Sequence, residues 1–247
     1  MIQLFGWFAF ATLAYGASLV VLAPASYLAG FAPAALKPFI WDARGSAWNG
    51  RISLGSGRDS SVDLLWRFDA IALAEGCAKF SVDNSKLDVH ALVRGQVTVC
   101  PLAKNVTLTD FDVHTNMAQW TSLASRYVEE LEGVVAMTLQ RVEWSRDKLQ
   151  AQGRFVWRAA RVYSESSVSL GEVTGDVHTE GNAAQVRVEN FNGEISLSGR
   201  LLLSPEGSYQ LNGTVDPRDN TGVAHAMDWL GVPASDGSYR VRFVGQL

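Results

Sequence analysis

Beyond Lys37 the dominant pattern is a strict alternation of apolar and polar residues with a period of two. This alternation predicts β-strands that bury one face and expose the other, which is typical of antiparallel sheets. The clearest stretches are 62–68, 86–93, 149–157, 195–203, 209–215 and 239–244.

The alternation changes phase twice, near Thr109 and near Gln140. A one-residue slip turns every following side chain to the other face, so an extra residue in a β-bulge is predicted at each point. Glycines also interrupt otherwise regular strands, at Gly153, Gly175, Gly199 and Gly213. Because bulges and interior glycines often mark bends, the prediction is a mainly β fold with a strongly curved antiparallel sheet, as a rolled sheet or an open barrel.

Two short helices are predicted within this sheet domain. The first runs from Met117 to Glu132, with one apolar face and a capping residue at Asn116, and the second covers about 222–230. The first helix is either a docking site for a partner or an ordinary solvated helix. Its candidate docking residues are Trp120, Tyr127, Glu129 and Glu130.

The N-terminal segment has a different pattern, because no charged residue or histidine precedes Lys37. The apolar run from Ile2 to about Leu28 exceeds the roughly 20 residues that a membrane-spanning helix needs. We therefore predict a transmembrane signal anchor at 1–30, a juxtamembrane linker at 31–44 and a β domain at 45–247. A cleaved signal peptide is the alternative, although such peptides normally have a basic start and a shorter apolar core. The charges flanking the run do not decide the orientation.

The chain has two cysteines, Cys77 and Cys100, in a region of β character. In an exported protein they are expected to form a disulfide, which would place the domain in the periplasm or outside the cell. Two buried thiols are the alternative.

Charge and side-chain chemistry exclude several function classes. With 21 basic and 25 acidic side chains, the chain has no basic excess of the kind that nucleic-acid binding requires. Its four histidines, at 90, 114, 178 and 225, lack the spacing of a metal site. No nucleophile motif or phosphate-binding glycine loop is present in the sequence. We expect no catalytic residue, cofactor or metal, and hence no enzyme.

Several short motifs nevertheless occur in a definite order. An apolar segment ending near Pro24-Ala25 is followed by Gly45-x-x-Trp48-x-Gly50, by a strand with Trp66, and by Asp236-Gly237-x-Tyr239 leading to Gly245-x-Leu247. In this the chain resembles protein N of the bacterial type II secretion system, although Ser46 stands where that family commonly has threonine. The resemblance implies a single-pass inner-membrane protein with a periplasmic β domain. Its partners would be other inner-membrane subunits of the machine that exports folded proteins.

Trp48 and Trp66 have two interpretations, as core residues of the sheet or as anchors at the membrane interface. The predicted function is a non-catalytic accessory subunit of that secretion system, held to membrane lipid by its N-terminal helix. The alternative is a membrane-anchored periplasmic protein that binds or transfers a lipid ligand in a β-groove, as AsmA-like proteins do. Whether inward residues such as Phe155, Trp157, Leu201 and Leu203 form a closed core or an open groove would decide between them.

Overall fold

The computed structural model describes residues 22–26, 40–55, 61–84, 91–121, 129–163, 167–218 and 233–246. The chain divides into two compact units, Met1–Phe68 and Asp69–Leu247, and each is described by itself. The predicted anchor, apart from residues 22–26, and the predicted helix at 222–230 lie outside the described residues. Among the residues that are described, no helix has the length and apolar character needed to cross a membrane.

The first unit is an antiparallel three-stranded meander. It consists of β1 (Ile40–Gly45), β2 (Asn49–Gly55) and β3 (Ser61–Asp69). Strand β1 begins inside the segment 31–44 that the sequence suggested as a linker. Residues 22–26 lie against the turn between β1 and β2, because Pro24 forms a β-bridge with Ser46.

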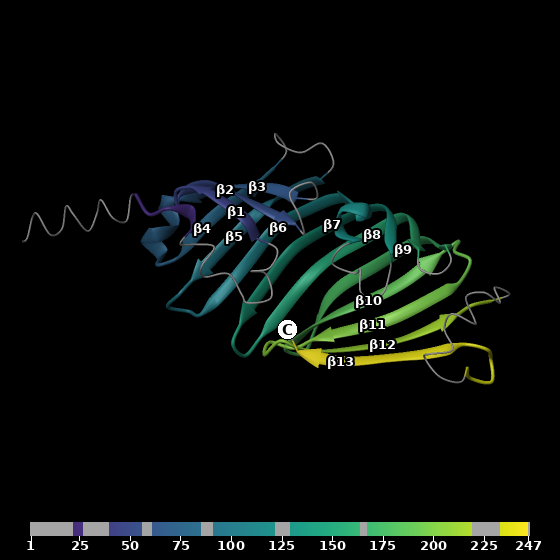
Figure 1. Ribbon diagram of the computed structural model, residues 1–247. Coiled ribbons are helices and arrows are strands. Elements are labelled where there is room, and N and C mark those ends of the chain that lie inside the picture. The colour runs from purple at the N-terminus through teal and green to yellow at the C-terminus, as the bar shows by residue number, and fades with distance from the viewer. Residues whose placement is uncertain are drawn as a thin grey trace, which may run out of the picture. The chain divides into compact units, whose positions relative to one another are not determined.

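The second unit is a ten-stranded antiparallel meander in which each strand pairs with the next one along the chain (Figure 1). Its strands are β4 (Ala78–Asp83), β5 (Ala91–Cys100), β6 (Asn105–Asn116), β7 (Glu130–Ser145), β8 (Leu149–Tyr163), β9 (Ser167–Glu180), β10 (Ala183–Phe191), β11 (Ser196–Leu203), β12 (Ser208–Asp216) and β13 (Tyr239–Gln246). Two 3-10 helices, η3 (Ala70–Glu75) and η4 (Met117–Trp120), lie between strands.

Both predicted bulges are confirmed. Strand β6 has an extra residue at Asp110 relative to β5, and β7 has one at Gln140 relative to β8. The two bulges lie side by side, because Thr109 pairs with Arg141 and Phe111 pairs with Leu139. Strands β6 and β7 therefore change phase together and keep their mutual register.

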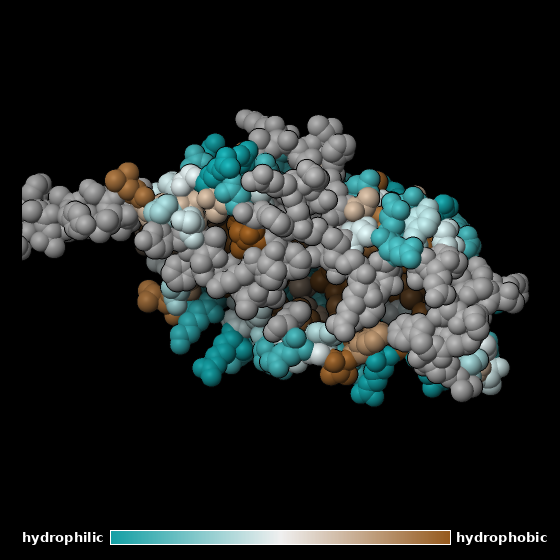
Figure 2. Space-filling view, in the orientation of Figure 1, coloured by the Kyte–Doolittle hydropathy of each residue, from teal (hydrophilic) through white to brown (hydrophobic). Residues whose placement is uncertain are grey.

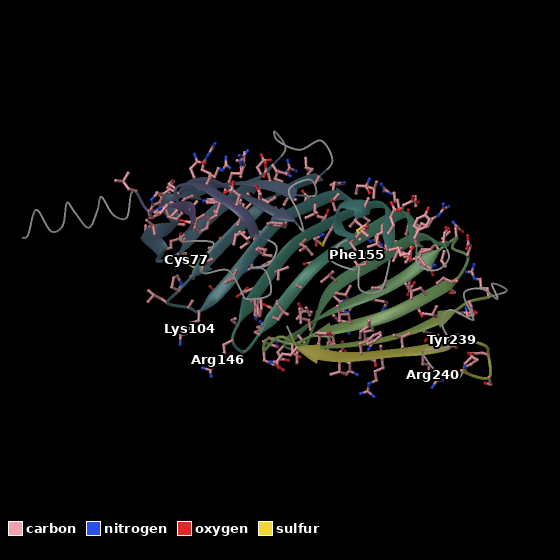
Figure 3. The ribbon with its side chains drawn as sticks, in the orientation of Figure 1. Cys77, Lys104, Arg146, Phe155, Tyr239 and Arg240 are labelled. Carbon is pink, nitrogen blue, oxygen red and sulfur yellow. A yellow bond between two sulfur atoms is a disulfide. The ribbon has the colours of Figure 1, made fainter. Side chains whose placement is uncertain are left out.

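The prediction of a strongly curved, rolled or barrel-like sheet is wrong, because the sheet is neither closed nor strongly curled. In the described part of the second unit, β13 pairs with β12 alone, so the sheet ends there in an edge. Two of the interior glycines that suggested bends have another role. Leu139 packs over Gly153, and the ring of Phe155, labelled in Figure 3, packs over Gly175. These glycines make room for a large side chain of the neighbouring strand.

The predicted helix from Met117 to Glu132 is also wrong at its C-terminal end. Met117–Trp120 form a 3-10 helix and Thr121 is helical, residues 122–128 lie outside the described residues, and Glu130 begins β7. The backbone N–H of Glu129 donates to the carbonyl of Tyr163, 2.8 Å away, and Leu131 pairs with Val162. Pairing with β8 therefore overrides the helical pattern of this segment, as tertiary contacts commonly do.

Most apolar side chains of the second unit lie on one face, and some of them form two buried clusters. One contains Leu149, Ala151 and Ala184, and the other contains Ile195 and Val215. The remaining apolar side chains of this face are mostly half-buried. Figure 2 shows hydrophobic residues recessed in the middle of the view and hydrophilic residues along its lower border.

Candidate docking surface

A single row of polar residues crosses the opposite face of the whole second unit, and each member is the register partner of the next. We call it the polar row. From β4 to β13 it contains Asp83, Arg94, Asp112, Thr138, Arg154, Asp176, Arg187, Arg200, Asn212 and Arg242.

In the first part of the polar row, arginine and carboxylate side chains compensate each other. Arg94 forms an ion pair with Asp112 at 3.3 Å, and Arg154 forms one with Asp176 at 3.1 Å. Both pairs are solvent-exposed and contribute little stability, because exposed ion pairs are typically worth about 0–1 kcal/mol. Within these two pairs, on β5, β6, β8 and β9, each positive charge is balanced by a neighbouring negative charge.

From β10 onward the compensation stops. The carboxylate beside Arg187 is Asp176, which is already bonded to Arg154, and the residue on the other side of Arg187 is Arg200. Like charges directly opposite each other on neighbouring strands are destabilising. Among the described residues, neither arginine has an ion-pair partner, and the same holds for Arg242.

These arginines border a hollow of about 470 Å³ that crosses β10 to β13, which we call the arginine trough. The polar row forms one side, with Arg187, Arg200, Asn212 and Arg242. The neighbouring row on the same face, two residues away on each strand, forms the other side. It contains Glu189, Ser198, Thr214 and Arg240. Between them the backbone of Val188, Gly199, Gly213 and Val241 forms the floor.

The trough opens on the polar face, because side chains alternate between the two faces of a strand. Val188 and Val241 are register neighbours of the two glycines, and their side chains point to the apolar face. All four arginines are exposed. Figure 3 marks Arg240 next to Tyr239 at the start of β13; Tyr239 is buried and Arg240 is exposed.

Asp236 lies just before β13, four residues before Arg240. Its pKa is lowered, first by a hydrogen bond from the Ser238 hydroxyl at 2.7 Å and then by one from the Ser238 backbone N–H at 3.0 Å. The positive charge of Arg240 lowers this pKa further.

The two tryptophans of the sequence motif lie in the first unit. Trp66 is 8% exposed, lies across Gly50, and its Nε1–H donates to the carbonyl of Ala47 at 3.1 Å. The backbone N–H of Ala47 in turn donates to the carbonyl of Ala23 at 2.7 Å. The motif therefore connects the strands to the end of the apolar N-terminal run.

Trp48 is half-buried, and its ring centroid lies 4.7 Å from that of Phe68 in an edge-to-face arrangement. Both tryptophans make contacts within their own unit. A contact of either residue with a membrane stays a prediction.

The two cysteines are joined by a disulfide between Cys77 and Cys100. They continue the ladder of β4 and β5, because Ala78 pairs with Val99. Of the predicted docking-helix residues, Trp120 ends η4, Tyr127 lies outside the described residues, and Glu129 and Glu130 lie at the start of β7. Glu130, as a strand residue, does not share a helix with Trp120.

The arginine trough was missed by reasoning from the sequence, although each of its members is visible there. The four arginines lie at positions 187, 200, 240 and 242 and form no basic run. The only local signal is Arg-x-Arg at 240–242 in the last strand. The register of β10, β11, β12 and β13 brings the four together.

An open antiparallel sheet with a disulfide defines a mainly β protein. Residues 39–242 match the family described as Type II secretion system (T2SS), protein N. The match covers most of the chain, so the protein belongs to this family and is a type II secretion system component. The family is part of the secretion machinery and is not known as an enzyme. Comparison with the curated proteins and with the solved structures gave no significant match.

Proposed function

We propose that the protein is a non-catalytic accessory subunit of the type II secretion system that is anchored in the inner membrane and presents its β-sheet to other subunits on the periplasmic side. The observation that carries this proposal is the family match, which spans β1 to Arg242 of β13. The disulfide supports a cell-envelope location, because disulfides persist in oxidising compartments. The uncharged N-terminal run supports the anchor.

The geometry suits an assembly role, because the sheet offers extended surfaces. Its last strand has one unpaired edge in the described structure, and its polar face carries the arginine trough. The backbone hydrogen bond from Ala47 to Ala23 would hold the first unit close to the membrane segment.

The experiment is complementation of a strain that lacks this protein, with export of a folded type II substrate as the readout. Crosslinking in the native membranes, followed by purification of the full-length chain, would identify the neighbouring proteins. We expect export to fall without the protein and secretion-system subunits to be recovered with it. Normal export together with the absence of such subunits from the crosslinked material would refute the proposal.

A second candidate, a lipid-binding groove, is favoured by one observation on the apolar face. Phe155, Trp157, Leu201 and Leu203 are only half-buried in the described structure. If this face binds lipid, the full-length chain purified in mild detergent would retain stoichiometric phospholipid in native mass spectrometry. Leu201→Asp would then release it. Lipid retained by the wild type and lost from this variant, with no secretion subunit crosslinked, would favour the lipid carrier over the accessory subunit.

A further inference from the structure

We propose that the arginine trough binds an acidic segment of a partner protein in extended conformation, running across β10 to β13. This inference rests on the proposed role as a docking subunit and specifies the chemistry of the docked partner. It concerns the polar face of the sheet, which neither the family match nor the sequence pattern assigns to a function.

The first argument is local charge. The chain as a whole has a formal net charge of −4, yet among the described residues four arginines and a single glutamate line the trough. Elsewhere in the polar row Arg94 and Arg154 each have a carboxylate partner. The direct opposition of Arg187 and Arg200 costs stability within the chain itself. Local arrangements that oppose stability are expected where function requires them, and a bound anion would remove the repulsion.

The second argument is the spacing of the positive charges, which lie at the two ends of the trough. Arg187 and Arg200 lie on β10 and β11, and Arg240 and Arg242 lie on β13. Strands are about 4.8 Å apart, so the two ends are separated by roughly 10–14 Å. An extended peptide advances about 3.3 Å per residue and covers that distance in three or four residues. Two carboxylates three or four residues apart would therefore reach both ends.

The third argument is the chemistry between the two ends. Ser198, Thr214 and Asn212 line the middle of the trough with two hydroxyl groups and an amide. These neutral groups can donate and accept hydrogen bonds with a peptide backbone. At the ends, guanidinium groups bind carboxylates through charge-assisted and frequently bidentate hydrogen bonds.

The same lining disfavours a lipid as the occupant. The apolar residues of the trough, Val188 and Val241, contribute to the floor while their side chains point to the other face of the sheet. Among the described residues that line the trough, none places an apolar side chain on this face, and the exposed Phe191 and Val244 lie on it only outside the lining. A lipid needs apolar contacts for its acyl chains, whereas an acidic protein segment has no such requirement.

The binding test uses the full-length chain in mild detergent and the peptide Gly-Glu-Ser-Ser-Glu-Gly-amide with fluorescein on its N-terminal amine. We expect saturable binding that weakens with added salt, because exposed charges are screened. The variant Arg200→Gln/Arg242→Gln should bind roughly tenfold more weakly or worse, since hydrogen bonds to charged groups are worth about 1.5–3 kcal/mol.

The matched control is Arg94→Gln/Arg141→Gln, which removes two arginines of the same face outside the trough. It leaves the Arg154–Asp176 ion pair beside Arg187 intact. The side chains of Arg94 and Arg141 are 65% and 64% exposed, so the control makes the same change in net charge on the same face. It should bind the peptide as the wild type does. Equal losses in both double variants would show non-specific attraction and overturn the proposal. Equal binding of a peptide with Gln in place of Glu would also overturn it.

A photocrosslinking amino acid in place of Asn212, in the full chain in its native membranes, identifies the natural occupant. We expect a crosslinked protein segment with at least two carboxylates within four residues. Recovery of phospholipid alone, or of a neutral or basic segment, would overturn the proposal. Complementation separates this inference from the proposed function: if deletion abolishes export but Arg200→Gln/Arg242→Gln restores it fully, the trough is not the docking site, whereas the assembly role stands.

Discussion

The strongest test of the fold concerns Asn190, a buried amide at the end of β10 that is 9% exposed. Its Nδ2 group donates to the carbonyls of Leu170 and Ile195, each at 2.9 Å. Its Oδ1 accepts from the backbone N–H of Leu197 at 2.6 Å. One side chain thus makes three hydrogen bonds to the backbone of β9, of β11 and of the turn before β11.

Asn190→Ala leaves these three backbone groups without their partner in a largely dry environment. Each hydrogen bond is worth about 1 kcal/mol net, and a buried group that stays unsatisfied costs about 1–3 kcal/mol. Allowing for water entering the space, we expect the free energy of unfolding to fall by about 2–4 kcal/mol. That is a large part of the 5–15 kcal/mol typical of folded domains.

The assay is urea unfolding of the full-length chain in mild detergent, followed by far-ultraviolet circular dichroism. The control is Asn212→Ala, because Asn212 is exposed and accepts a single hydrogen bond, from Gln210 at 3.4 Å. This control should change the free energy of unfolding by less than about 0.5 kcal/mol. If Asn190→Ala and Asn212→Ala unfold at the same urea concentration, the argument that the buried amide stabilises this part of the sheet is refuted.

Three further predictions test packing, the crosslink and pH. Gly175→Ala places a Cβ against the ring of Phe155, so we expect a loss of about 1–3 kcal/mol in urea unfolding, and Phe155→Ala should remove most of that additional loss in the double variant. Replacing both Cys77 and Cys100 by alanine should lower the free energy of unfolding by roughly 3 kcal/mol, and a reductant should then have no further effect; an unchanged urea midpoint would contradict this. Because the pKa of Asp236 is lowered in the folded state, its carboxylate stabilises the fold above its ordinary pKa of 3.8, and this contribution is lost as the pH falls through the lowered value. Asp236→Asn should therefore be less stable than the wild type at pH 7, and the difference should vanish in strong acid; a difference independent of pH would contradict the assignment.

Local pattern predicted the elements of the sheet well, because the period of side-chain alternation is set by the backbone of a strand. The stretches at 62–68, 149–157, 195–203 and 209–215 all lie within observed strands, apart from Ile195. The bulges near Thr109 and Gln140 were visible for the same reason. The local pattern was misleading at 129–132. The apolar spacing there predicted a helix, but residues 130–132 pair with β8 in the sheet.

By itself, the sequence determined an antiparallel β protein with an apolar N-terminal run, two cysteines able to pair, and the short motifs that resemble its family. Tertiary structure alone decided which strands lie side by side and in what register. Arg187 and Arg242 are far apart in the sequence, but they stand in one row because β10 to β13 pair in succession. Alternation fixes the face on which a side chain lies and contains no information about its neighbour on the next strand. The charge balance of that face, and with it the arginine trough, therefore depends on the assembled sheet.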